Sequence, residues 1–246
     1  MRYLVLSDLH SNLEALGSVL DRARDLGYDR TLVLGDIVGY GPDPNAVVEI
    51  LSRQSGTVSI RGNHDRVAAG LSEPDDFNEG ARLSARWTRT ALDGASLAFL
   101  RSLPRGPLLF AERRLLAHGS PMDEDEYILE ESAARRAFDG IDFDLCFFGH
   151  THYPCCIALE GGRVTLDIAR GDRTVFSIGP TPRYLINPGS VGQPRDRNPR
   201  CSFAIYDDVE STVTVHRIEY PLEQTRLKIL QAGLPPTLGD RLRMGR

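Results

Sequence analysis

The motif Gly149-His150-Thr151-His152 constrains this chain more than any other feature, because it directly follows the apolar run 145–148. The run predicts a buried strand, and the motif places two imidazoles where that strand ends. In an extended segment His150 and His152 project to the same side, since alternate residues share a face. The fold must therefore present two imidazoles together at the exit of a buried strand.

The other histidines follow a related pattern. Of the six histidines in the chain, five lie in short clusters with Gly, Asp or Asn, and each cluster stands at the end of a strand-like run. His216 is the exception, because it alternates with valines on a late predicted strand, and we expect it to pack within the sheet. The clusters are Asp8-Leu9-His10, Gly35-Asp36, Gly62-Asn63-His64-Asp65, His118-Gly119 and Gly149-His150-Thr151-His152. We expect them to converge around metal ions.

The first sixty residues alternate strand and helix. Strands are predicted over 2–7, 31–34 and 57–60, with helices after the capping-box pattern Ser11-Asn12-Leu13-Glu14 and over 44–53. Such alternation predicts parallel strands, and the loops at their carboxyl ends then carry the chemistry.

The rest of the chain predicts one continuous domain, residues 1–246. A helix is expected over 77–103, broken near Asp93-Gly94, and short strands dominate from 143 to 218. We expect these later strands to supply a second sheet. The acidic stretch 122–140 is interpreted as a partly helical solvated face, with a mobile lid as the alternative. A last helix near 222–232 and a Pro/Gly/Arg-rich C-terminal tail, 233–246, complete the prediction.

Composition excludes several classes of function. The net charge of −5 argues against a nucleic-acid coat protein and against binding to anionic membranes. No apolar run approaches the roughly 20 residues of a membrane span, and no signal-peptide pattern precedes the first strand. The four cysteines form no disulfide framework, and the pair Cys155-Cys156 is interpreted as strand filler. A cytoplasmic location is the simplest expectation.

The clustered residues indicate a particular metal chemistry. A mixed set of imidazole and oxygen donors suits Zn, Mn, Fe or Co better than an all-oxygen calcium site. The set is too large for one tetrahedral ion with an open position, but it suits two ions that share a carboxylate. Two divalent ions contribute +4 against −2 from Asp8 and Asp36, so the centre would attract an anionic substrate.

The ordered series D-x-H, G-D, G-N-H-D, H and G-H-T-H resembles the calcineurin-like metallophosphoesterase superfamily, and Asn187–Val191 extends the likeness. The resemblance implies a four-layer α-β-β-α sandwich, with two mixed sheets face to face and helices outside. It implies that a hydroxide bridging the two ions attacks the phosphoester, and that His64 protonates the leaving oxygen or steadies the developing charge. The implied ligands are Asp8, His10 and His152 for one ion, Asn63, His118 and His150 for the other, and Asp36 as the bridge.

One departure from the pattern is informative. The protein-phosphatase branch of the superfamily carries an Asp and then an Arg after Gly-Asp, where this chain has Gly39 and Tyr40. His64 is therefore expected to lack an orienting carboxylate, and the small bacterial phosphodiesterase or nucleotidase branch is favoured. The loop Asn187–Val191 is expected to matter through its backbone shape.

Residues beside the clusters leave alternatives open. Asn12 and Arg66 are candidate substrate-binding residues, although Asn12 could instead cap a helix and Arg66 could be a surface charge. For Tyr40 and Tyr127 packing is favoured over stacking on a substrate ring. Asp65 is expected to bind loop backbone. In the loop that carries Arg195, Asp196 and Arg197, solvation of both arginine side chains is favoured over binding of an anion.

The sequence thus predicts an α/β, cytoplasmic, dinuclear-metal phosphoesterase, most of all a phosphodiesterase of small-molecule or nucleotide substrates, with no stable nucleic-acid or membrane partner. A non-catalytic scaffold of the same fold is a rival, but such scaffolds are expected to have eroded ligands. A nuclease is another rival, which the absence of a basic cluster disfavours. A protein or nucleotide phosphatase is the remaining alternative.

Overall fold

The computed structural model describes residues 1–246, which form two six-stranded sheets and eight helices. The strands are β1 (Arg2–Leu6), β2 (Arg30–Val33), β3 (Thr57–Ser59), β4 (Leu108–Ala111), β5 (Arg114–Leu116), β6 (Leu145–Phe147), β7 (Cys155–Glu160), β8 (Arg163–Ile168), β9 (Arg173–Ser177), β10 (Arg183–Asn187), β11 (Cys201–Asp207) and β12 (Thr212–Ile218). The helices are α1 (Leu13–Leu26), α2 (Pro44–Arg53), α3 (Asn63–Ala68), α4 (Glu79–Ala91), α5 (Gly94–Ser102), α6 (Glu131–Gly140), α7 (Leu222–Gln231) and α8 (Pro236–Met244). None of the helices is both long and apolar enough to cross a membrane.

The N-terminal strands pair as the alternation of elements predicts. β1, β2 and β3 run parallel, and α1 and α2 form the crossovers between them. α1 begins where Asn12 accepts a hydrogen bond from the N–H of Ala15 at 3.1 Å. The expected capping box from Ser11 to Glu14 is wrong in this detail, since the shorter Asn12 side chain already satisfies a free N–H at the helix start.

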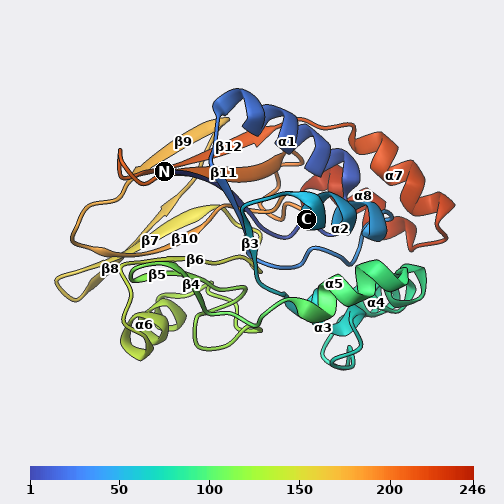
Figure 1. The fold of residues 1–246 in the computed structure, drawn as a ribbon, viewed down its shortest axis with the longest axis horizontal. Coiled ribbons are helices and arrows are strands. Elements are labelled where there is room, and N and C mark those ends of the chain that lie inside the picture. Colours follow the sequence, from blue (N-terminus) through green and yellow to red (C-terminus); the bar gives the residue numbers. More distant parts are fainter.

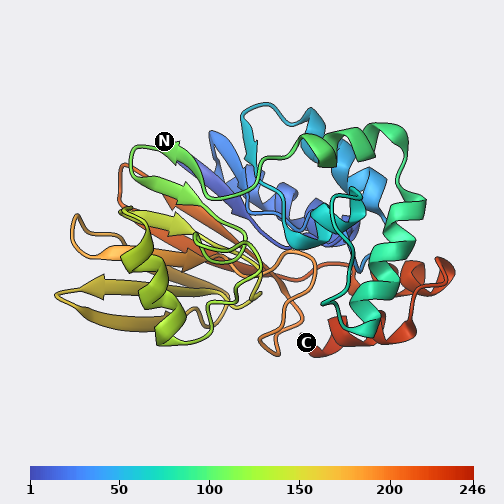
Figure 2. The same cartoon turned by 90° about the horizontal axis from the view of Figure 1, so that it is seen from below.

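Figures 1 and 2 show the two sheets packed face to face, with helices outside them. A core of 17 buried residues fills the space between the sheets, with members such as Val5, Phe147 and Tyr206. A second core lies between the first sheet and α1, α2 and α5, and a third lies under α6 on the outer face of the second sheet. The predicted α-β-β-α sandwich is confirmed.

The assignment of later strands to one sheet is wrong. The first sheet has the order β3-β2-β1-β11-β12-β9 and the second the order β4-β5-β6-β10-β7-β8. Strands that follow residue 143 therefore belong to both sheets. The mostly apolar sequence of β11 explains part of this, because it lies antiparallel to β1 near the middle of the first sheet and six of its seven residues are buried.

The tail expected at 233–246 is a helix instead. Leu238 and Leu242 of α8 are buried in a small core with Tyr40 of the β2–α2 loop and Ala81 of α4. Their spacing of four residues puts both side chains on one face of the helix. This face anchors the C-terminal segment beside the loops that carry the predicted site.

Candidate metal centre

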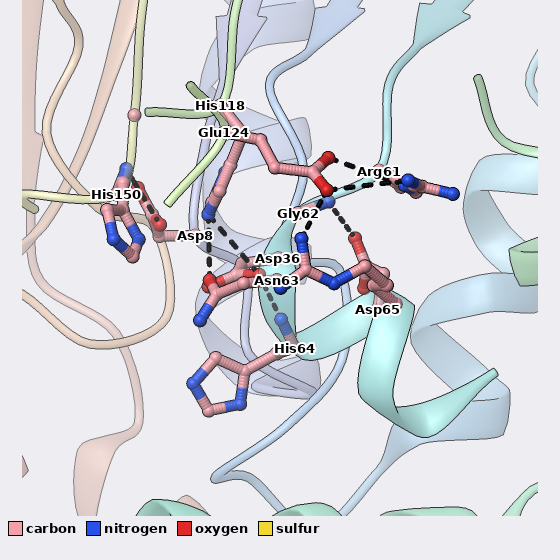
Figure 3. A network of polar contacts seen from close by, with 12 residues as sticks. Asp8, Asp36, Arg61, Gly62, Asn63, His64, Asp65, His118, Glu124 and His150 are labelled. Atoms are coloured by element: carbon pink, nitrogen blue, oxygen red, sulfur yellow. Dashed lines mark hydrogen bonds and ion pairs between the residues drawn. The ribbon is translucent and has the colours of Figure 1, made fainter. Parts of the chain in front are cut away.

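All five predicted clusters meet at one end of the two sheets. Asp8, Asp36 and Asn63 follow β1, β2 and β3, whose parallel arrangement brings their carboxyl ends together. His118 and His150 follow β5 and β6, which run parallel in the second sheet. The two sheets thus contribute from opposite sides, and Figure 3 shows these five side chains turned toward one another. All seven predicted metal ligands are buried.

The first group of donors is Asp8, His10 and His152. His152 Nε2 lies 3.4 Å from Asp8 Oδ1 and 3.3 Å from His10 Nε2. The Asp8 carboxylate also accepts hydrogen bonds from the Ser7 hydroxyl at 2.7 Å and from the main-chain N–H of His150 at 3.2 Å. These bonds fix the carboxylate where an ion could sit between it and the two rings.

The second group contains Asp36, His118 and His150. His118 Nε2 lies 3.5 Å from Asp36 Oδ1 and 3.0 Å from the side-chain oxygen of Asn63. The other carboxylate oxygen of Asp36 lies 3.7 Å from His10 Nε2, which belongs to the first group. Asp36 therefore faces both groups, as a bridging ligand must.

Hydrogen bonds from the far side of each ring determine which nitrogen is free. His10, His118 and His152 place Nδ1 3.2, 2.9 and 2.5 Å from the main-chain carbonyl oxygens of Val38, Leu34 and Gln193. A carbonyl only accepts, so Nδ1 carries the ring proton in the neutral form and Nε2 presents a lone pair. The Nε2 atoms of His10 and His152 then face each other as two acceptors, which is favourable only with a cation between them.

Two further buried atoms lack any partner within the protein. They are Oδ2 of Asp36 and Nε2 of His150, and both lie in the second group. A buried acceptor without a partner costs about 1–3 kcal/mol. Both atoms are typical ligands of Mn, Fe, Zn and Co, so the residues present fit the predicted pair of ions.

The pKa values of the histidines also indicate a site for cations. Burial lowers the pKa of His150 to about 3 and holds the pKa values of His10 and His152 well below the ordinary value, which keeps these rings neutral and able to bind a metal. Burial also lowers the pKa of His118, but Asp36 and Asp8 outweigh it and raise that pKa to about 10. The carboxylates thus favour a positive charge at this point, as a proton or as a cation.

The backbone at the centre is strained. Five of the seven predicted ligands have a left-handed conformation, which costs a residue other than glycine about 1–2 kcal/mol. They are Asp8 (φ 53°), His10 (φ 49°), Asp36 (φ 50°), His150 (φ 64°) and His152 (φ 61°). Strain of this kind persists only where surrounding contacts impose it, and it gathers at functional sites.

The loop after β10 supplies some of these contacts, as its predicted role in backbone shape requires. The Asn187 amide donates to the carbonyl of Gly149 at 2.8 Å, and the Ser190 hydroxyl donates to the carbonyl of Asp8 at 2.8 Å. At Gly192 an added Cβ would meet the carbonyl carbon of Leu9 at 2.5 Å, so only glycine fits. The loop therefore fixes the first and last clusters without contributing a ligand atom.

His64 lies at the edge of the centre (Figure 3). Its main-chain N–H donates to Asp36 Oδ1 at 2.9 Å, its Nδ1 has no partner, and burial lowers its pKa to about 4. No carboxylate binds Nδ1, and Gly39, whose added Cβ would lie 2.5 Å from that atom, has no side chain to offer one. The expectation that His64 lacks an orienting carboxylate is confirmed.

The candidate substrate-binding residues have different surroundings. Asn12 is buried, caps α1 and donates to the carbonyl of Gly192 at 2.9 Å, so both ends of its amide are used within the protein. Arg66 is paired with Glu124 and Asp125, and it also lines the cavity that contains His64 and His150. Neither observation shows a substrate contact. Asp65 accepts from the main-chain N–H of Val38 and of Gly62, as expected.

The acidic stretch is not wholly solvated. The side chain of Glu124 is only 4% exposed and is surrounded by Arg61, Arg66 and Arg105. It ties the segment after His118 to the loop before α3, as Figure 3 shows. The pattern of alternating acids gave no sign of this, because the three arginines come from distant parts of the sequence.

Aromatic residues surround an opening beside the second group. A cavity of about 180 Å³ is lined by Asn63, His64 and His150 together with Tyr40, Phe77 and Tyr127. The Tyr127 ring stacks on His150 with 3.8 Å between centroids, and Phe77 lies 4.5 Å from His64. Tyr40 and Tyr127 thus pack on histidines of the site, and Tyr127 is also 45% exposed beside the cavity.

The expectation that the Arg195 side chain is solvated is wrong. This residue is half-buried, and its guanidinium donates to Gln193 Oε1 at 3.0 Å and to the Tyr40 hydroxyl at 3.4 Å. Gln193 itself holds His152 through its main-chain oxygen. The signal available was the position of Arg195 only four residues beyond Val191, in a loop already assigned to the site.

Two face-to-face sheets with buried carboxylate, imidazole and amide donors at their strand ends are the arrangement of a metal-dependent phosphoester hydrolase. Residues 1–211 match the family model of the calcineurin-like phosphoesterase superfamily domain. The chain belongs to this superfamily, and the expectation of a metal-dependent phosphoester hydrolase is confirmed.

Several relatives support this assignment. An uncharacterised protein of Methanocaldococcus jannaschii, MJ0912, is 36% identical over 98% of this chain and 97% of its own. A metallophosphoesterase from Sphaerobacter thermophilus is 39% identical, and its crystal structure matches with a TM-score of 0.88 over 100% of this chain and 99% of that one. The phosphodiesterase YfcE of Escherichia coli is 24% identical over 88% of this chain and 93% of its own.

Proposed function

We propose that this protein is a dinuclear-metal phosphodiesterase that hydrolyses a small-molecule or nucleotide phosphoester. Asp8, His10 and His152 would hold one divalent ion, and Asn63, His118 and His150 the other. Asp36 would bridge them, since its two oxygens face the two groups. When bound, such ions supply positive charge for the phosphoryl oxygens and make water a nucleophile near neutral pH.

The strongest support for the proposal is the geometry of two histidine rings in the first group of donors. The Nε2 atoms of His10 and His152 lie 3.3 Å apart while both Nδ1 atoms are committed to carbonyl oxygens. Without a cation this arrangement is repulsive, and with one it is a ligand pair. This pair of imidazoles therefore favours a metal-binding enzyme over a scaffold that has lost its metal ligands.

His64 is the residue that we assign to the leaving group. Its ring lines the cavity beside the second group, and its Nδ1 is unpaired. A neutral imidazole at this point can donate a hydrogen bond to the departing oxygen, and the protonated ring can give it a proton. The diester preference is supported by the likeness to the E. coli phosphodiesterase and by the absence of a carboxylate at Gly39.

The test is hydrolysis of bis-p-nitrophenyl phosphate by protein stripped with a chelator and reloaded with manganese or cobalt. We expect activity to return with metal, and His64→Ala to lower kcat by about 10²–10⁴-fold while the bound metal stays at the wild-type level. The main-chain bond from residue 64 to Asp36 survives this substitution. A metal-loaded, folded protein that is inert on phosphodiesters and phosphomonoesters would contradict the proposal.

A further inference from the structure

Two arginines beside the metal centre, Arg195 and Arg241, have no aspartate or glutamate partner. Arg195 is held by the Gln193 side chain and the Tyr40 hydroxyl, it also lies against the Tyr127 hydroxyl, and its Nε is buried without a hydrogen bond. The Arg241 side chain in α8 donates to the main-chain oxygen of Arg246 at 3.0 Å. The acids that adjoin them in sequence are committed elsewhere, Asp196 to Arg217 and Asp240 to Arg226.

The ring of Tyr40 relates the two guanidiniums to the centre. Its centroid lies 5.7 Å from Cζ of Arg195 and 5.8 Å from Cζ of Arg241. The same ring lies 4.8 Å from the His10 ring and 4.5 Å from the His64 ring. The Tyr40 ring therefore lies between the two guanidinium groups and the rings of His10, a predicted metal ligand, and His64, the residue assigned to the leaving group.

The position of both side chains is built into the fold. Figure 2 shows the loop that follows β10 beside the C-terminal helix. The N–H of Arg197 donates to the carbonyl of Gly245 at 2.8 Å, which ties this loop to the end of α8. The buried face of α8 around Leu242 fixes the helix. These are not free surface arginines, and like charges held close together without an aspartate or glutamate partner favour an anion between them.

Charge decides what kind of anion fits. With two divalent ions, Asp8 and Asp36 leave the proposed centre at +2, and a phosphodiester brings only −1. Arg66 pairs with Glu124 and Asp125, and Glu124 also pairs with Arg61 and Arg105, so these three arginines exceed their two carboxylates by one positive charge. Arg195 adds a further +1, which a diester alone does not balance, whereas Arg241 already binds the main-chain oxygen of the last residue of the chain. A guanidinium fork is also suited to two phosphoryl oxygens at once.

We propose that Arg195 and Arg241 form a subsite for a second phosphoryl group, so that the substrates are phosphodiesters or phosphoanhydrides with at least one phosphate beyond the scissile one. This inference rests on the proposed function of the metal centre. Arg241 lies outside residues 1–211, the part of the chain that matches the superfamily domain, so α8 would tailor a shared centre to this substrate class.

The experiment measures inhibition of bis-p-nitrophenyl phosphate hydrolysis by adenosine mono-, di- and triphosphate at fixed free manganese. In the wild type we expect Ki to fall at least tenfold from the monophosphate to the di- or triphosphate. Arg195→Gln should remove most of this preference while retaining its manganese, and Arg195→Lys should restore part of it. Arg197→Gln is the matched control, because this exposed arginine lies in the same loop.

The outcomes separate the two proposals. A wild type that hydrolyses no phosphoester with either manganese or cobalt overturns the proposed function. A wild type that is active but shows no preference among the three nucleotides overturns only the subsite. The same holds if Arg195→Gln keeps the wild-type preference, or if Arg197→Gln loses it equally.

Discussion

Asp36 offers the most direct test of a shared metal pair. The substitution Asp36→Asn keeps an oxygen that can accept the N–H of His64, so the loop geometry is preserved, but it removes the charge that faces both donor groups. Each ion at about 100 times its Kd stabilises the folded state by about 2.7 kcal/mol, so two independent sites contribute about 5 kcal/mol. A chain of 246 residues gains about 2–4 °C in Tm per kcal/mol.

Saturating manganese should therefore raise the Tm of stripped wild-type protein by about 10–20 °C. In Asp36→Asn the rise should fall below about half of this value, because neither group keeps its shared carboxylate. Thermal unfolding followed by circular dichroism, with and without manganese, measures both rises, and Asp167→Asn on the exposed face of β8 is the control. An equal rise in Asp36→Asn and wild type would refute the bridging role.

Other predictions concern different parts of the molecule. Gly62→Ala should weaken manganese binding, because an added Cβ would meet the main-chain nitrogen of Asp36 at 2.5 Å; a metal titration measures this. Gly17→Ala inside α1 meets nothing within 4 Å, so it should raise the free energy of unfolding by about 0.5–1 kcal/mol, which thermal unfolding measures. Burial lowers the pKa of His216 to about 4, below the unfolded value of 6.5, so the unfolded chain binds more protons and stability falls as the pH drops from about 6.5 to 4. Because the ring keeps some contact with water, the loss should be at most about 2 kcal/mol, and His216→Phe should reduce the pH dependence of the unfolding free energy; an unchanged dependence would contradict this origin.

Much of the site could be predicted because its information is local. Each donor cluster directly follows an apolar run, so the sequence shows both the strand and the residue at its end. Parallel pairing of β1, β2 and β3 then brings Asp8, Asp36 and Asn63 to one edge without any knowledge of distant contacts. Asp65 and Asn12 were interpretable for the same reason, since turn and cap hydrogen bonds reach only nearby or adjoining loops.

The features that were missed depend on contacts between distant segments. Alternation identifies β9 as a strand, but nothing in it says that β9 pairs with β12 at the edge of the first sheet. The burial of Glu124 depends on Arg61, Arg66 and Arg105. In 233–246 the Pro, Gly and Arg content obscured the pair of leucines that anchors α8, although their helical spacing was visible.

Gln193 connects the two proposals physically. Its main-chain oxygen accepts from His152 Nδ1, which leaves Nε2 free toward an ion, and its side-chain oxygen holds the Arg195 guanidinium. The residue is buried, and its own N–H is held by the Ser190 hydroxyl at 2.8 Å, the hydroxyl that also binds the carbonyl of Asp8. A displacement of this loop would thus disturb the metal ligands and the arginine together. The rigidity that orients the imidazole is therefore the same rigidity that would place a second phosphate at a fixed distance from the first, which is how a shared catalytic centre can acquire a preference among phosphoesters.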